Sequence, residues 1–198
     1  NLTATEGAND PLIVTATYKL GSLQKAEWHI APDGGARLVY SYIFNGVVDL
    51  MGVKFDLPET EVKHKEWLGC GPYRVWKNRI HGPQLGVWAN DYNDPVPGES
   101  FDYPEFKGYF AGVQWMKLQT KTGMITICPG TDKDYVGVYQ PRDGRDQLLY
   151  TLPETGISMM QVIPAVRNKV NTTDLNGPSA QPVWANGSYT GEVTLHFD

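Results

Sequence analysis

The stretch Trp67-Leu-Gly-Cys-Gly-Pro-Tyr-Arg-Val-Trp-Lys-Asn-Arg79 places two indoles, a phenol and three cations around a glycine and proline segment. Gly69 and Gly71 can adopt φ values closed to other residues, and Pro72 has a fixed φ, so we expect a stiff turn that presents the side chains after it. Flat rings that can stack on sugars, next to cationic hydrogen-bond donors, are typical of a carbohydrate-binding site. The alternative is that both tryptophans are core residues flanking a tight turn.

Apolar and polar residues alternate on both sides of this stretch, in segments rich in Val, Ile, Thr, Tyr and Trp. Such alternation predicts strands with one buried face, and helical periodicity is nearly absent. The predicted strands are Leu12–Leu20, Gln24–Ile30, Ala36–Phe44, Val48–Asp56, Val62–Leu68, Gly86–Asn90, Phe110–Thr120, Met124–Cys128, Tyr135–Tyr139, Ser158–Ile163 and Tyr189–Phe197.

Turn-forming residues separate several of these segments. The predicted turns include Asp33-Gly34-Gly35, Asn45-Gly46, Thr122-Gly123 and Asn186-Gly187. Many strands joined by short turns predict an all-β fold, an antiparallel β-sandwich or a barrel.

Composition restricts the possible partners. The 198 residues, 41% of them apolar and 20% charged, are typical of a globular domain. A formal net charge of −5 argues against a nucleic-acid partner, because phosphate binding needs a clustered excess of Lys and Arg. There is no apolar run long enough to cross a membrane, so we expect no membrane partner. Cys70 and Cys128 could pair, and the sequence leaves that open.

Metal and cofactor motifs are missing from the sequence. The four histidines are dispersed without the spacing of metal ligands. The acidic clusters Asp91–Asp94 and Asp132–Asp134 favour solvated turns over a calcium loop, since they lack its regular alternation and glycine. No nucleotide, dinucleotide or serine-hydrolase motif occurs. We therefore expect neither metal nor cofactor.

Four segments of the sequence together suggest a family by their order and spacing. They are Met51-Gly-Val-Lys-Phe-Asp-Leu-Pro58, Trp67-Leu-Gly-Cys-Gly-Pro72, Pro104-Glu-Phe-Lys-Gly108 and Val113-Gln-Trp115. From about Arg37 onward, their order and spacing resemble the C-terminal domain of glycoside hydrolase family 2 β-galactosidases. There the corresponding segments are a glycine, aromatic and Leu-Pro segment, W-x-G-x-G-P, P-Q-E-N-G and V-R-W. The resemblance implies the supersandwich, a galactose mutarotase-like antiparallel β-sandwich.

The segment Trp67–Pro72 is called the signature below. The residues that follow its proline differ from the family pattern. The family continues E-x-Y-x-D-R, where this chain has Arg74, Trp76, Asn78 and Arg79, so only the final arginine is kept. Basic or apolar residues also replace family residues within Pro104–Gly108. The resemblance therefore implies a divergent subfamily, with a different glycan or linkage from the β-galactosidases.

In the family, the two catalytic glutamates lie on a separate TIM barrel. A barrel takes about 250 residues of alternating strands and helices, which this chain lacks. The resemblance implies that residues 1–198 are one β-sandwich domain, the C-terminal fragment of a larger bacterial glycosidase in the periplasm or outside the cell. Such a domain is not an enzyme by itself and has no catalytic residue. Its partners would be the upstream catalytic domain and a carbohydrate, a galactoside or another plant or host glycan.

The resemblance places a candidate carbohydrate-binding rim on either side of the long Pro-rich segment. Its residues are Arg74, Trp76, Arg79, Glu105, Lys107 and Tyr109. Two alternatives remain open: Arg79 and Glu105 could pair to tie two loops together, and Trp76 could belong to the core. We expect the tryptophans without a basic neighbourhood to be core residues: Trp28, Trp88, Trp115 and Trp184.

Two other functions compete with an accessory domain. A free-standing carbohydrate-binding module would expose Trp76 or Tyr109 on a groove. A mutarotase-like epimerase would need a histidine beside a carboxylate as general acid and base, for which His64 or His81 with Glu105 are the candidates.

Overall fold

A computed structural model describes residues 1–5, 11–57, 62–91, 108–139, 156–166, 175 and 177–198 of the chain. The described residues form antiparallel strands and one short 3₁₀ helix, η4 (Pro178–Ala180). The strands are β1 (Leu2–Thr5), β2 (Leu12–Thr17), β3 (Leu23–Ile30), β4 (Ala36–Val48), β5 (Met51–Phe55), β6 (Val62–Val75), β7 (Gln84–Asp91), β8 (Tyr109–Thr120), β9 (Met124–Pro129), β10 (Tyr135–Tyr139), β11 (Gly156–Val162) and β12 (Val183–Phe197).

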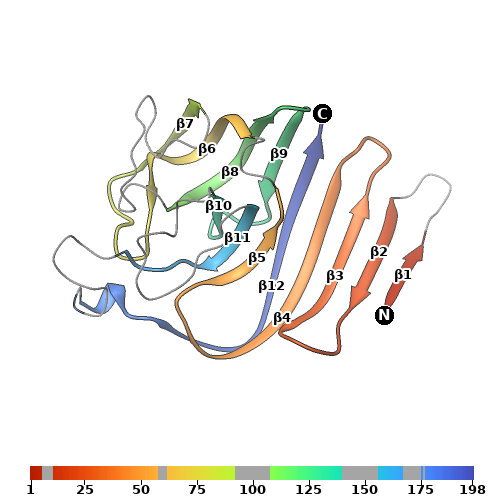
Figure 1. Cartoon of the computed structure of the whole chain (residues 1–198), viewed down its shortest axis with the longest axis horizontal. Coiled ribbons are helices and arrows are strands. Elements are labelled where there is room, and N and C mark those ends of the chain that lie inside the picture. Colours follow the sequence, from red (N-terminus) through yellow and green to blue (C-terminus); the bar gives the residue numbers. More distant parts are fainter. Residues whose placement is uncertain (6–10, 58–61, 92–107, 140–155, 167–174, 176) are drawn as a thin grey trace.

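The strands form two layers that meet at β8 (Figure 1). The larger layer runs β1-β2-β3-β4-β12-β9-β8, and β6 and β7 extend it beyond β8. The smaller layer consists of β10, β11 and β5 and joins β8 through the pairing of Val136 with Phe110. The predicted all-β antiparallel fold is thereby confirmed.

The main core fills the space between the layers. Tyr40 and Tyr42 of β4 face it from the larger layer, and Met51 and Met159 face it from the smaller one. Trp67 is also buried there, with its indole 4.9 Å from the ring of Phe110 and nearly perpendicular to it. The period-two pattern of the sequence therefore marks the faces that the two layers bury against each other.

Each predicted strand overlaps an observed one, but two predicted turns are wrong. Thr122-Gly123 does connect β8 to β9, and Asp33-Gly34-Gly35 lies between β3 and β4. Asn45-Gly46 and Asn186-Gly187, in contrast, lie inside β4 and β12, where Asn45 is paired with Asn186. Each dipeptide has a partner distant in sequence, and the long pairing of β4 with β12 overrides the local preference for a turn.

The signature glycines serve close packing instead of a turn. β6 continues through Gly69 and Gly71 to Val75, and neither glycine has a positive φ. A Cβ on Gly71 would lie 2.6 Å from a ring carbon of Trp88, and one on Gly69 would lie 3.1 Å from the carbonyl oxygen of Ala111. At Gly71 the Trp88 ring occupies the space of a side chain, and at Gly69 the neighbouring strand leaves a side chain little room.

Candidate functional site

The residues after the signature form a second core. Trp76 is 1% exposed and Tyr109 is 0% exposed, with their rings 5.9 Å apart and nearly perpendicular. Met160, Ile163 and other apolar residues complete the cluster. Neither ring offers a face to solvent, so the prediction that Trp76 or Tyr109 stacks on a sugar is wrong.

The turn at Trp76–Arg79 fastens a distant segment to this second core. The Asn78 amide nitrogen donates to the Val166 carbonyl at 2.8 Å, and the Val166 amide donates to Asn78 Oδ1 at 2.9 Å. The Lys77 backbone amide also donates to the Pro164 carbonyl at 3.0 Å. Asn78 therefore makes both backbone bonds that a neighbouring strand residue would make, and it stabilises segment 163–166 against the end of β6.

Arg74 also faces the interior. Its side chain is buried, and its guanidinium carbon lies 5.2 Å from the centroid of the Phe110 ring. A cation over an aromatic face is attracted by the ring quadrupole. The prediction that Arg74 lies on an exposed rim is therefore wrong, because the strand continues through the signature and turns this side chain inward.

The remaining predicted rim residues do not assemble a site in the described structure. Arg79 is exposed, and its backbone bonds to that of Trp76 close the turn. Glu105 and Lys107 lie outside the described residues, so their predicted contact with Arg79 stays a prediction.

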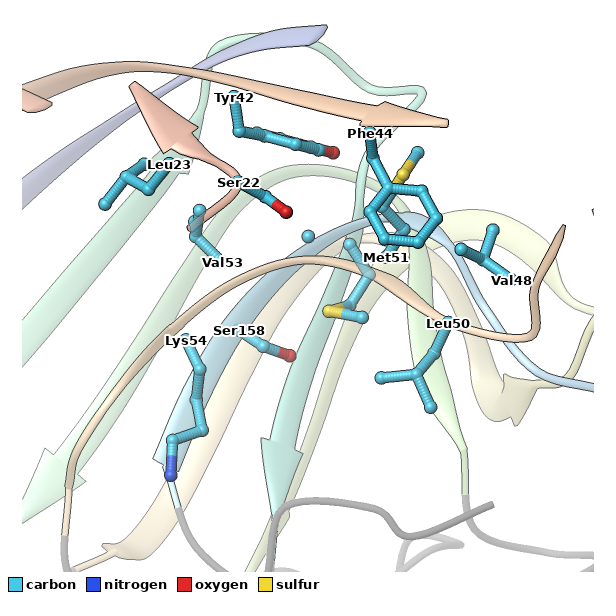
Figure 2. A pocket seen from close by; sticks show the side chains of 12 residues that line it. Ser22, Leu23, Tyr42, Phe44, Val48, Leu50, Met51, Val53, Lys54 and Ser158 are labelled. Atoms are coloured by element: carbon cyan, nitrogen blue, oxygen red, sulfur yellow. The ribbon is translucent and has the colours of Figure 1, made fainter. Parts of the chain in front are cut away.

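A cavity of about 550 Å³ opens between β4 and the smaller layer. Figure 2 shows Tyr42 and Phe44 extending from β4 above Leu50 and Lys54. Most of its lining is apolar, with polar groups from Ser22, Tyr42, Lys54 and Ser158. The volume suits a small molecule, and the Tyr42 hydroxyl in its wall is already bonded to Gln161. The mostly apolar lining therefore suits a ligand with a large apolar part.

Tyr42 connects the cavity wall to the smaller layer. Its hydroxyl donates to Gln161 Oε1, and its ring stacks on Tyr189 at 5.4 Å. Burial, together with the negative charge of Asp134, raises the pKa of Tyr42 to about 12. The hydroxyl therefore stays protonated at neutral pH and acts as a fixed donor instead of an acid or base.

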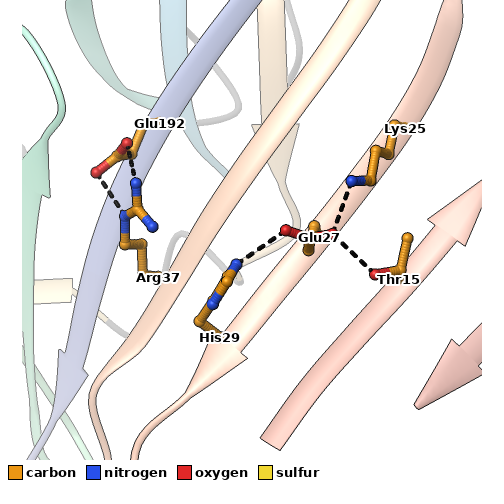
Figure 3. Close-up of polar contacts among 6 residues, drawn as sticks. All are labelled: Thr15, Lys25, Glu27, His29, Arg37 and Glu192. Atoms are coloured by element: carbon orange, nitrogen blue, oxygen red, sulfur yellow. Dashed lines mark hydrogen bonds and ion pairs between the residues drawn. The ribbon is translucent and has the colours of Figure 1, made fainter. Parts of the chain in front are cut away.

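A polar network lies on the outer face of the larger layer (Figure 3). The Glu27 carboxylate contacts Lys25 Nζ at 2.7 Å, Thr15 Oγ1 at 3.0 Å and His29 Nε2 at 3.0 Å. Across the neighbouring strands, Arg37 donates two hydrogen bonds of 2.7 and 2.6 Å to Glu192. Two of these contacts cross strands, Thr15 with Glu27 between β2 and β3 and Arg37 with Glu192 between β4 and β12, and they support the pairing of those strands.

His29 and Glu27 are the residue types of a general acid and base pair, but the Glu27 carboxylate is too weakly basic for that role. Hydrogen bonds from Lys25, then His29 and Thr15, lower the pKa of Glu27 to about 2. A carboxylate of that pKa is a weak general base at neutral pH. The predicted candidate His64 instead lies 2.8 Å from Asp91, and neither histidine lines the 550 Å³ cavity.

Trp184 departs most from its prediction. The sequence placed it in the core, but its side chain is 72% exposed. Trp28 and Trp88 are partly buried and pack against the main core, and Trp115 is partly buried beside the Lys117 ammonium. The alternation of residues along β12 could have predicted that Trp184 is exposed, because Ala185 beside it is buried. That prediction would have required knowing that β4 is the partner strand.

The described residues contain no group of three His, Cys, Asp or Glu side chains placed to share a metal ion. Within the same ranges, none of the helical structure is long and apolar enough to cross a membrane. Cys70 and Cys128 are both free thiols, and burial raises the pKa of the Cys128 thiol.

Comparison with known proteins supports the fold assignment. No protein-family model matches the chain, and no curated protein sequence matches it. Galactose 1-epimerase from Lactobacillus acidophilus NCFM is similar in structure, with a TM-score of 0.52 at 9% identity, over 100% of this chain and 66% of the epimerase. A galactose mutarotase related enzyme from Lactobacillus acidophilus matches with a TM-score of 0.39 at 9% identity, over 100% of this chain and 71% of that protein.

The chain thus has an all-β antiparallel sandwich fold that resembles galactose mutarotase structures. At 9% identity the likeness concerns the fold alone. The chain spans about two thirds of the epimerase, 66% of its length.

Proposed function

We propose that the chain is the non-catalytic C-terminal supersandwich domain of a family 2 glycoside hydrolase, exported to the periplasm or the exterior of a glycan-degrading bacterium. It supports a carbohydrate active site whose two catalytic glutamates lie on a preceding domain. By itself the chain is not an enzyme.

One observation carries the proposal: the residues that follow the family signature pack in the interior and hold distant segments together. Trp76 packs edge to face on Tyr109, and Asn78 makes two backbone bonds to Val166. The buried side chains Arg74, Trp76 and Tyr109 support a scaffold role for this region, while Arg79 and Tyr73 remain exposed. The order of the family motifs and the mutarotase-like fold agree with this role, although fold alone does not determine function.

The test is the activity of the complete reading frame against that of the chain alone. We expect the longer protein to hydrolyse a nitrophenyl glycoside, and to lose that activity when either glutamate of its barrel is replaced by glutamine. The isolated chain should neither hydrolyse the glycoside nor speed the exchange of galactose anomers. A reading frame without a preceding catalytic domain, or rapid anomer exchange by the chain, would overturn the proposal.

A carbohydrate-binding module is the second candidate, favoured by the exposure of Trp184. The module would not use Trp76 or Tyr109, which are buried. An epimerase would need a histidine beside a carboxylate as general acid and base. Its predicted carboxylate, Glu105, lies outside the described residues, so this alternative stays a prediction.

A further inference from the structure

The C-terminal end of β4 and the N-terminal end of β12 form a two-stranded ribbon, here defined as residues 43–48 paired with residues 183–188. The pairing of β3 with β4 ends at Tyr42, and that of β9 with β12 begins at Val193. No other described strand is paired with the ribbon. Its inner face packs on the protein through Ala185, which is buried, and through Phe44, which lines the cavity.

The outer face of the ribbon is exposed along its whole length. Val47 is opposite Trp184, Asn45 is opposite Asn186, and Ile43 is opposite Ser188. Trp184 is 72% exposed, Val47 56% and Ile43 43%. An indole therefore lies at one end of a strip that continues through two amides to a hydroxyl. We call these six residues the ribbon strip.

The ribbon geometry is held from both strands. Asn45 Oδ1 accepts a hydrogen bond of 2.9 Å from the Gly187 amide, and the Tyr189 hydroxyl accepts one of 2.9 Å from the Asn186 amide. Tyr189 in turn stacks on Tyr42 of the main core. The strip is thus pre-organised, which lowers the entropy lost when a ligand binds.

The strip is free of charge. None of the ribbon residues is Asp, Glu, Lys or Arg, and the nearest charged residues along the chain are Asp49 and Glu192. Glu192 is paired with Arg37, and the Lys77 ammonium is bonded to the carbonyl oxygen of Gln181, three residues before Trp184. A partner with a charged surface would lose hydration here without gaining an ion pair, so a neutral partner is favoured.

The size of the strip argues against a protein partner. Stable protein interfaces bury about 800 Å² and roughly 20–30 residues on each side, whereas the strip offers six side chains on two strands. Its length from residue 184 to residue 188 is about 13 Å at the usual rise of a strand, enough for a short oligosaccharide. The indole face can stack on the C–H face of a pyranose, and the amides and the hydroxyl can donate to and accept from its hydroxyl groups.

We propose that the ribbon strip is a surface site for a neutral oligosaccharide, with Trp184 as the stacking platform and Asn45, Asn186 and Ser188 as hydrogen-bonding partners. The inference rests on the proposed function only for the class of ligand. It places glycan binding on a face built by β4 and β12, away from the signature.

The test titrates the chain with neutral hexasaccharides of β-galactan, xylan and cellulose, with oligogalacturonate as the charged comparator. Calorimetry and tryptophan fluorescence report binding. We expect at least one neutral probe to bind, with affinity falling about tenfold or more in Trp184→Ala and about fivefold in Asn186→Ala. The control Tyr18→Ala, a change at an aromatic residue that is 43% exposed outside the ribbon, should bind as the unchanged chain does.

Three results would overturn the inference. They are no binding of any neutral probe at millimolar concentration, binding that Trp184→Ala leaves unchanged, and self-association of the chain that Trp184→Ala abolishes, which would make the strip a protein interface. A reading frame without a catalytic domain would instead defeat the accessory role and leave Trp184-dependent binding intact. The two failures are therefore distinguishable.

Discussion

Trp76 and Trp184 show how far local sequence can mislead about exposure. Trp76 is surrounded by Arg74, Lys77 and Arg79 in the sequence, yet it is 1% exposed. Trp184 has no charged neighbour, yet it is 72% exposed. The cations near Trp76 belong to a strand end and a turn that close over the second core. The apolar residues near Trp184 belong to a ribbon over whose outer side no described strand packs.

The comparison assigns different tasks to the two regions. The second core holds segment 163–166 against the end of β6, so its side chains should control stability. The ribbon strip contributes little to packing, so its side chains should control binding. Matched substitutions in the two regions can test this division.

The largest effect is expected for Trp76→Ala. Removing the indole leaves a cavity beside Tyr109 and Met160 and should lower the free energy of unfolding by about 3–5 kcal/mol. Trp184→Ala is the matched control and should change it by no more than about 0.5 kcal/mol. Urea denaturation followed by circular dichroism measures both. Equal costs for the two variants would refute the division of tasks.

Asn78→Ala should have the next largest effect. It removes two hydrogen bonds and leaves the Val166 amide and carbonyl without these partners, at a cost of about 1–3 kcal/mol. Asn186→Ala, which alters an exposed amide of the ribbon strip, should be nearly neutral in the same denaturation experiment. A neutral Asn78→Ala would mean that segment 163–166 is held by other contacts.

Gly71→Ala tests the role of the signature glycine in packing. Its new methyl group would lie 2.6 Å from a ring carbon of Trp88, and the overpacking should cost about 1–3 kcal/mol. The same substitution in a Trp88→Leu background should cost less, because the obstructing ring is gone. Additive costs in this double-mutant cycle would show that backbone conformation, and not the Trp88 ring, demands glycine here.

The smallest effect concerns the charged part of the outer face, beside the uncharged ribbon. The pKa of Glu27 is lowered from 4.5 to about 2, so its ion pairs stabilise the fold above pH 4.5 and that contribution is lost as the pH falls toward 2. The stability difference between the unchanged chain and Glu27→Gln should therefore shrink across this range. Unfolding measured from pH 6 to pH 2 tests it, and a difference independent of pH would contradict the assignment.

Much of the fold could be predicted because its cause is local. Alternation along residues such as Leu38, Tyr40 and Tyr42 already identifies the face of β4 that is buried. β1 was not predicted, since its four residues are all exposed and have no buried face to set the pattern. The turns at Asn45 and Asn186 were wrong because each is paired with the other across the β4–β12 ribbon.

The candidate site was less predictable. The exposure of Arg74, Trp76 and Tyr109 depends on whether β6 turns at its glycines or continues through them. The sequence does not distinguish the two cases, because glycine is compatible with both a turn and a closely packed strand. The low pKa of Glu27 was equally unpredictable from the sequence, because it depends on Lys25, His29 and the Thr15 hydroxyl of the neighbouring strand.

The sequence by itself determined the class of the fold, since alternating apolar residues can bury only one face of a strand and must find a second layer. It also determined the uncharged nature of the segments around Trp184. Only the tertiary structure decided which tryptophan meets solvent. Burial is set by the layers that pack against a side chain. Residues distant in the chain, Tyr109, Met160 and Ile163, cover Trp76, whereas Trp184 stays 72% exposed.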